Sequence, residues 1–214
     1  MQLIIGNKNY SSWSLRPWLL MQHFDLDFAE QQLWLYQQDT NEQLAVHCPN
    51  SKVPVLIDND LRVWDSLSIC EYINERYLAN KALPTAINKR AEMRSICAEM
   101  HSGFSALRDE MPMNCRREKS AIRLSAAAEK DIARIIQIFS TVLEKKPTAE
   151  HFLFGEFSIA DAFFMPVVVR FSIYAIQLPK IVQQYHNKML QLPAYQQWLR
   201  AAEQELPTID TAQR

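Results

Sequence analysis

The sequence lacks features that would assign it to several common classes of protein. Its net charge at pH 7 is −1, from 23 basic and 24 acidic residues among 214. No stretch is strongly basic, so the charge gives no reason to expect a nucleic acid as partner. No run approaches the ~18 apolar residues of a membrane span, and no basic segment followed by a long apolar one opens the chain. We therefore expect a soluble cytoplasmic protein without a membrane or nucleic-acid partner.

Metal and disulfide motifs are missing as well. The four cysteines, Cys48, Cys70, Cys97 and Cys115, contain no C-x-x-C pair, and their spacing fits no zinc site. The five histidines are scattered and show no metal-ligand spacing. We expect reduced, mostly structural thiols and no bound metal.

What the chain does have is a large apolar content and two dissimilar halves. Hydrophobic residues make up 48% of the sequence, which is enough for a sizeable core. Residues 1–78 mix short apolar runs with helical stretches, whereas strand signals almost disappear after a linker at 79–87. We predict an α/β domain at 1–78 and an all-helical domain at 88–214.

The α/β half predicts the order β-α-β-α-β-β-α. Its last two strands flank a turn and form a hairpin. Strands are expected at 2–5, 28–34, 53–57 and 61–64, and helices at 13–24, at 39–47 and from residue 65 onward.

The second half predicts helices that are separated by proline residues. They are expected at 88–111, 116–145, 158–176, 179–191 and 193–204, with breaks at Pro112, Pro147, Pro179 and Pro193.

Hydroxyl side chains gather where the first strand meets the first helix, in the segment Tyr10–Ser14, which reads YSSWS. A helix N-terminus carries unsatisfied N–H groups and partial positive charge, so it stabilises an anion such as a thiolate. A hydroxyl that donates to the thiolate lowers the thiol pKa further. The alternative is that these serines only cap the helix.

Two further segments carry groups that are suited to binding a ligand. If the bond before Pro54 is cis, the backbone of Val53 turns outward and can pair with an extended peptide ligand; an ordinary trans proline is the alternative. Asp65 and Ser66 open the third helix, where N–H groups and the Ser66 hydroxyl suit a carboxylate and Asp65 can pair with an amine. The alternative for this pair is an N-cap and nothing more.

In this order, these motifs resemble the glutathione-binding domain of soluble glutathione transferases. The SSWS segment is similar to the serine-type active site of zeta-like and related bacterial members. The resemblance implies a thioredoxin-like domain followed by a helical domain, with glutathione as co-substrate and a small electrophile as acceptor. It also implies a homodimer and a role in detoxification.

The resemblance assigns roles to individual residues. Ser11 would stabilise the glutathione thiolate, with Ser12 as its nearest competitor. The rest of glutathione would contact Lys52 at its glycyl carboxylate, the backbone of Val53 before a cis Pro54 at its cysteinyl part, and Asp65 and Ser66 at its γ-glutamyl end.

The segment Phe157–Asp161 resembles the S/T-x-x-D box of the same family. Ser158 as N-cap can bond the N–H of Asp161, and the Asp161 carboxylate can bond back to the cap. We expect this box to be structural and not catalytic.

The chain also departs from the zeta-like pattern. Trp13 replaces a cysteine that is associated with maleylacetoacetate isomerase activity, and Ile173 stands where those enzymes have a substrate-binding arginine. Arg170 lies three residues earlier, and it either pairs within the fold or faces the substrate cleft. Arg108 either lines the pocket of an anionic electrophile or lies at a solvated helix end. Trp13, Arg108 and Arg170 are thus the expected substrate-pocket residues.

We predict a glutathione transferase. The alternatives are a glutathione-dependent isomerase of the maleylacetoacetate type and a non-catalytic binding or regulatory protein, because some relatives keep this scaffold without transferase activity.

Overall fold

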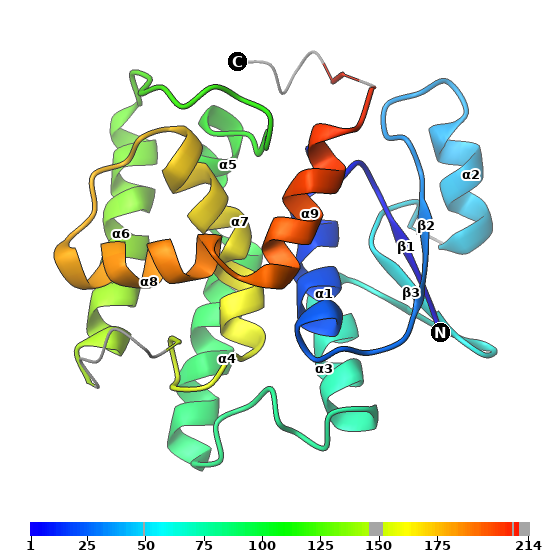
Figure 1. Ribbon diagram of the computed structural model, residues 1–214, viewed down its shortest axis with the longest axis horizontal. Helices are drawn as coiled ribbons and strands as arrows, with labels where there is room; N and C mark the ends of the chain where they lie inside the picture. The colour runs from blue at the N-terminus through cyan, green and yellow to red at the C-terminus, as the bar shows by residue number, and fades with distance from the viewer. Residues whose placement is uncertain (49, 146–151, 207, 210–214) are drawn as a thin grey trace.

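The protein folds into an α/β domain packed against a helical domain, as the sequence predicts (Figure 1). The computed structural model describes residues 1–48, 50–145, 152–206 and 208–209. Within this part of the chain, no helix is long and apolar enough to cross a membrane. The domain limits at 78 and 88 stay predictions.

The α/β domain is built on a four-stranded sheet with the order β2-β1-β3-β4. Strands β1 (Gln2–Ile5) and β2 (Ala29–Gln32) are parallel, and β3 (Val55–Asp58) runs antiparallel to β1 and to β4 (Leu61–Trp64). This arrangement brings the start of β3 beside the end of β1, with Ile4 opposite Val55.

Alternating side chains of the sheet enter two cores, as the two-residue period of a strand requires. Leu3 and Ile5 belong to the large core with α1 (Ser12–His23) and α3 (Ser66–Arg76). Ile4 belongs to a smaller core with α2 (Thr40–His47). Figure 1 shows α1 and α3 between the sheet and the helical domain, and α2 beyond the other face of the sheet.

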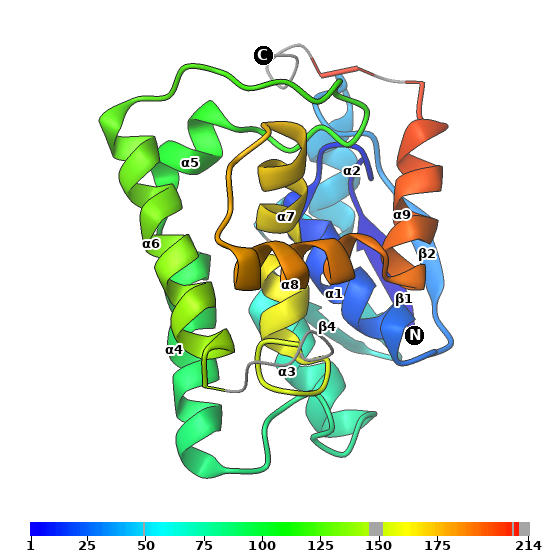
Figure 2. The ribbon, with the colours of Figure 1, turned by 60° about the vertical axis from the view of Figure 1, so that its left-hand side comes forward.

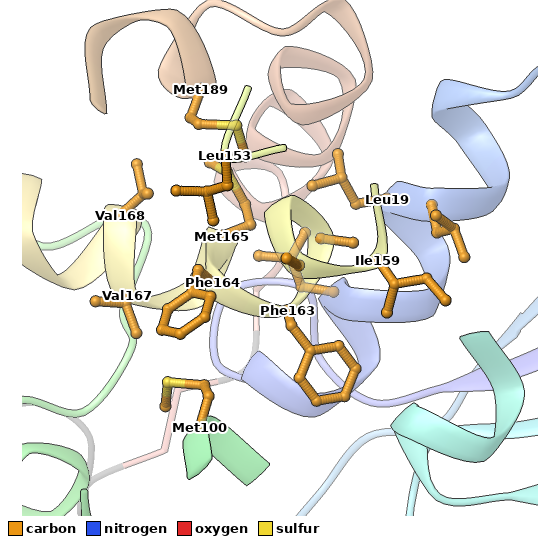
Figure 3. Close-up of a cluster of buried hydrophobic side chains, with 14 of the residues drawn as sticks. Leu19, Met100, Leu153, Ile159, Phe163, Phe164, Met165, Val167, Val168 and Met189 are labelled. Atoms are coloured by element: carbon orange, nitrogen blue, oxygen red, sulfur yellow. The ribbon is translucent and has the colours of Figure 1, made fainter. Parts of the chain in front are cut away.

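The helical domain is organised around α7, which lies in its middle and is crossed by α8 (Figure 2). The α7 side chains Phe163, Phe164 and Met165 point in different directions, towards neighbours such as Leu19 of α1 and Met100 of α4 (Figure 3). Because α7 packs on α1, one core joins the two domains. The helices are α4 (Ile87–Ser102), α5 (Ser105–Glu110), α6 (Ala126–Leu143), α7 (Ile159–Ile173), α8 (Lys180–Leu190) and α9 (Pro193–Glu203).

The capping box predicted at the start of α7 is confirmed. The Asp161 carboxylate accepts hydrogen bonds from the backbone N–H and the hydroxyl of Ser158, at 2.9 and 2.8 Å. Both residues are buried, so the box fixes the first turn of the central helix from inside the core.

Two helix predictions were wrong in the segment that follows α4. The expected helix 88–111 is interrupted at Gly103–Phe104, where Phe104 adopts a left-handed conformation with φ of 61°. The expected helix 116–145 begins only at Ala126. Tertiary hydrogen bonds hold residues 115–116 instead, because the N–H groups of Cys115 and Arg116 donate to the carbonyl and side-chain oxygens of Asn9 at 3.2 and 3.0 Å. The expected break at Pro147 lies outside the described residues.

Candidate functional site

A cavity of about 890 Å³ opens between the two domains. Its walls come from the N-terminus of α1, the segment 35–44 after β2, which includes the first part of α2, the loop before β3, the N-terminus of α3, and parts of α4, α5 and α7. Every residue that the sequence analysis assigned to the site lines this cavity: Ser11, Ser12, Trp13, Lys52, Val53, Pro54, Asp65, Ser66, Arg108 and Arg170.

At the α1 end of the cavity, Ser11 is the N-cap of the helix. Its Oγ accepts a hydrogen bond from the Ser14 N–H at 3.3 Å and lies 2.8 Å from the Ser14 Oγ. Ser14 Oγ in turn accepts from the N–H of Gly6 at 3.1 Å. The Ser12 hydroxyl, which also lines the cavity, makes no hydrogen bond to another described residue.

The contact between Ser11 and Ser14 leaves the Ser11 hydroxyl able to act as a donor. A hydroxyl rotates freely and can both donate and accept, so Ser14 can turn its hydrogen towards Ser11. The Ser11 hydrogen is then available to an anion in the cavity, with the helix N-terminus behind it. Capping and anion binding are therefore compatible at Ser11.

The loop before β3 presents backbone to the cavity. The Val53–Pro54 bond is cis, as the family resemblance implied. Within the described part of the chain, the N–H and C=O of Val53 have no backbone partner. Lys52 is exposed at the rim, and its N–H donates to Asn50 Oδ1 at 3.1 Å.

At the α3 end, Asp65 has a positive φ of 75°, an uncommon conformation that is found at functional sites. Its Oδ1 accepts from the N–H groups of Leu67 and Ser68 at 2.8 and 3.4 Å, so Asp65 caps the helix. Ser66 Oγ accepts from Nη1 of the buried Arg16 at 3.3 Å. The Ser66 hydroxyl hydrogen therefore points away from Arg16 and can be donated in the cavity.

The helical domain contributes two arginines to the cavity wall. Arg108 donates from Nε to the Gly103 carbonyl at 3.1 Å, and Arg170 donates from Nε to the Met111 carbonyl at 2.7 Å. Among the described residues, neither guanidinium forms a salt bridge with a carboxylate. Arg170 thus both forms hydrogen bonds within the fold and lines the cavity. Arg108 also lines the cavity, so it does not lie at a helix end that faces only solvent.

Cations crowd together at this wall. Burial, and secondarily the neighbouring charge of Arg108, lowers the pKa of Arg170 to about 10. Burial likewise lowers the pKa of Arg16 to about 9, with Arg108 and Arg170 acting in the same sense. The Trp13 ring contacts two of these groups, with the guanidinium carbons of Arg16 and Arg108 at 4.3 and 4.9 Å from its centroid.

Comparison with known families decides what kind of protein carries this cavity. Residues 10–76 match the model of the glutathione S-transferase N-terminal domain, and residues 118–201 match that of the C-terminal domain. The chain belongs to the glutathione S-transferase family.

Curated relatives of this transferase are distant. Glutathione S-transferase 1 of Dianthus caryophyllus is 28% identical over 173 residues, which are 79% of this chain and 76% of the relative. A stringent starvation protein A homolog of Haemophilus ducreyi is 24% identical over 153 residues, which are 70% of this chain and 68% of the relative.

Solved structures of transferases share the fold. A glutathione transferase homolog from Burkholderia, solved with bound glutathione, superposes with a TM-score of 0.73 at 20% identity and covers 95% of this chain and 98% of its own. A bacterial maleyl pyruvate isomerase of the zeta class superposes with a TM-score of 0.74 at 17% identity, over 97% and 100% of the two chains.

The position that carries a substrate-binding arginine in zeta-like transferases is occupied by a core residue here. Ile173 belongs to the large hydrophobic core and does not line the cavity. The cavity of this transferase therefore has guanidinium groups only from other positions of the helical domain, among the residues that the structure describes.

Two basic residues of this transferase site were not predicted from the sequence. His101, near the end of α4, lines the cavity and lies 3.1 Å from the Asp65 carboxylate, although no role was expected for any histidine. Arg16, wholly buried behind the site, contacts Ser66. Both contacts join residues at least 36 positions apart in the chain, so no local motif predicts them.

Burial makes three of the four cysteines of this transferase unreactive. All four are free, and burial raises the pKa of Cys70, of Cys97 and of Cys115, the last to about 12. Thiolates at these positions are disfavoured, so these cysteines are not expected to act as nucleophiles. In the described part of the chain, no group of three or more candidate ligands is arranged to hold a metal.

Proposed function

We propose that the protein is a glutathione transferase that joins the glutathione thiolate to a small electrophile in the interdomain cavity. The observation that carries this proposal is the joint lining of one cavity by a helix-capping hydroxyl, an unpaired peptide backbone and an Asp–Ser pair at a second helix start. These three features match the three parts of glutathione: thiol, peptide and charged amino-acid end.

The roles follow from what each group can donate or accept. Ser11 donates its hydroxyl hydrogen to the thiolate, and the N-terminus of α1 stabilises the same negative charge. The Val53 backbone pairs with the cysteinyl part, and Lys52 binds the glycyl carboxylate. Asp65 accepts from the α-amino group, while Ser66 donates to the α-carboxylate. The thiol proton leaves to solvent, and the sulfur then forms a bond to the electrophilic carbon. In a substitution the leaving group departs with its bonding electrons; in an addition the π electrons move to the neighbouring atom, which takes a proton from solvent.

Calorimetric titration with reduced glutathione and with S-hexylglutathione tests the binding site. Saturable binding of both is the expected outcome. Ser11→Ala should raise the pKa of the bound thiol and reduce kcat/KM with a standard electrophile at least tenfold, as expected when a donor to an anion is lost. Ser12→Ala is the matched control: a larger loss there would move the activating role from Ser11 to Ser12. Absence of binding by either ligand would favour a non-catalytic scaffold protein, the second interpretation of the fold.

A glutathione-dependent isomerase of carboxylated substrates is a second candidate. It is favoured by Arg108 and Arg170, which face the cavity without a carboxylate partner among the described residues. Trp13 and Ile173 argue against the maleylacetoacetate type, because they replace the cysteine and the arginine of the zeta-like pattern. Turnover of maleylacetoacetate, and its loss in Arg108→Met while a neutral electrophile is still conjugated, would support this candidate. Failure of that substrate or a close analogue to react would remove it.

The assembly and location of the protein belong to the same proposal. We expect a homodimer in the cytoplasm with a role in detoxification, on the strength of the family resemblance. A light-scattering mass near that of one chain would contradict the dimer.

A further inference from the structure

A histidine of the helical domain holds the carboxylate that opens α3 in the other domain. His101 Nε2 lies 3.1 Å from Asp65 Oδ2, and both side chains line the cavity with 30% and 38% of their surface exposed. The two atoms are within the distance of an ion pair when the imidazole is protonated. The contact therefore links the last turn of α4 to the N-cap residue of α3.

The imidazole ring has little freedom to turn away. It packs edge-on against Trp13 with 5.3 Å between ring centroids, and it lies 6.1 Å from the Phe163 ring. Its Nδ1 is buried and has no hydrogen-bond partner among the described residues. Aromatic packing on two sides thus orients Nε2 towards Asp65.

The two oxygens of Asp65 are fixed from opposite directions. Oδ1 accepts from the Leu67 and Ser68 N–H groups of α3, and Oδ2 lies 3.1 Å from His101 Nε2. The cap alone would leave the carboxylate plane free to rock about its terminal bond, whose torsional preference is broad. The second contact, with His101, restricts that plane, and the acceptor capacity of Oδ2 remains for a ligand donor.

We infer that His101 is a positioning residue for the γ-glutamyl end of glutathione. It orients the Asp65 carboxylate so that the free acceptor site of Oδ2 meets the α-amino group. This inference rests on the proposed function, because it concerns how that ligand is held. It gives the helical domain a part in binding glutathione, in addition to housing the acceptor substrate.

The test compares two ligands on matched variants. The ligands are glutathione and glutaryl-cysteinylglycine, which keeps the terminal carboxylate and lacks only the α-amino group. His101→Phe keeps a ring against Trp13 without a donor, and His101→Gln restores an N–H donor. The control is Arg94→Gln, because Arg94 pairs with Glu71 at 3.1 Å and also joins α4 to α3, but outside the cavity.

Calorimetry should show glutathione binding weakened about tenfold in His101→Phe, because the Asp65 carboxylate loses the contact that orients it, and largely restored in His101→Gln. The amine-free ligand should bind the wild-type protein and His101→Phe equally, and Arg94→Gln should bind glutathione as the wild type does. In steady-state kinetics the KM for glutathione should rise while kcat is unchanged.

Several outcomes would overturn the inference. They are unchanged glutathione affinity in His101→Phe, an equal loss for the amine-free ligand, an equal loss in His101→Gln, or an equal loss in Arg94→Gln. If His101→Phe does not fold, as judged by thermal melting, His101→Leu takes its place in the same comparison. Failure of the wild-type protein to bind glutathione would overturn the proposed function together with this inference, whereas the four outcomes above leave the proposed function intact.

Discussion

Two aspartates open helices in this protein, and their surroundings differ in how much acceptor capacity remains. Asp161, at the start of α7, is completely buried and accepts four hydrogen bonds, from Leu153 N–H, Ser158 N–H, Ser158 Oγ and Tyr185 Oη, at 2.8–3.1 Å. Asp65, at the start of α3, is partly exposed in the cavity; among the described residues it accepts hydrogen bonds only from N–H groups of α3, and His101 Nε2 lies 3.1 Å from its Oδ2. An aspartate in the first turn of one helix is therefore a closed structural group, whereas an aspartate at the N-cap of another helix is an open binding group.

The electrostatic surroundings of the buried carboxylate agree with a structural role. Burial raises the pKa of Asp161 to about 6, while its hydrogen bonds act in the opposite sense. Because all its oxygen capacity is used inside the protein, no ligand can recruit it. The comparison with Asp65 can be tested by removing each carboxylate in turn.

The largest effect on stability is expected from Asp161→Ala. The change leaves the N–H groups of Leu153 and Ser158 and the Tyr185 hydroxyl buried without their acceptor, and each such group costs about 1–3 kcal/mol. We expect the free energy of unfolding to fall by at least roughly 3 kcal/mol, as measured by urea denaturation. The folded fraction should bind glutathione as the wild-type protein does. A loss below about 1 kcal/mol would mean that the box is not the anchor of α7.

The largest effect on ligand binding is expected from Asp65→Ala. Glutathione affinity should fall at least tenfold, because a charge-assisted bond to the α-amino group is lost. Stability should fall by only about 1 kcal/mol, the usual cost of losing an N-cap. Asp65→Asn separates the two roles, since asparagine caps as well as aspartate but carries no charge. If Asp65→Asn binds glutathione normally in calorimetry, the carboxylate charge does not hold the amine.

These two sites also show what the sequence could and could not predict. Ser11, Pro54, Asp65 and Asp161 each belong to a short segment whose chemistry is local, because caps and strand openings are decided by neighbouring residues. The common cavity of Ser11, Pro54 and Asp65 was predicted from their order on the β-α-β-α-β-β-α pattern. Local pattern was therefore sufficient for the thioredoxin-like half and for the residues of that half that were expected at the site.

What the sequence could not predict depends on contacts between distant segments. His101 reaches Asp65 only because the fold brings the last turn of α4 near the start of α3, and helical periodicity does not specify that arrangement. Residues 116–125 have no helical structure although helical spacing favoured it, since Arg116 is held by Asn9 and Ser120 N–H donates to the Ile173 carbonyl at 3.0 Å. Tertiary hydrogen bonds outweigh helix propensities of a few tenths of a kcal/mol per residue.

The smallest effect is expected from a third helix start, which shares neither the burial of Asp161 nor the cavity of Asp65. Ser125 is exposed and caps α6, accepting from the Ala128 N–H at 3.2 Å while its own N–H donates to Glu110 at 2.8 Å. Ser125→Ala should lower the free energy of unfolding by about 1 kcal/mol, the same cost as the cap lost in Asp65→Ala, and should leave glutathione affinity unchanged. Urea denaturation and calorimetry on both variants measure this pair of quantities. Equal stability losses with unequal binding losses would assign the binding effect to the position of Asp65 in the cavity. A binding loss in Ser125→Ala would show instead that loosening any helix start disturbs the site, and the contrast between the open and the closed carboxylate would no longer explain recognition.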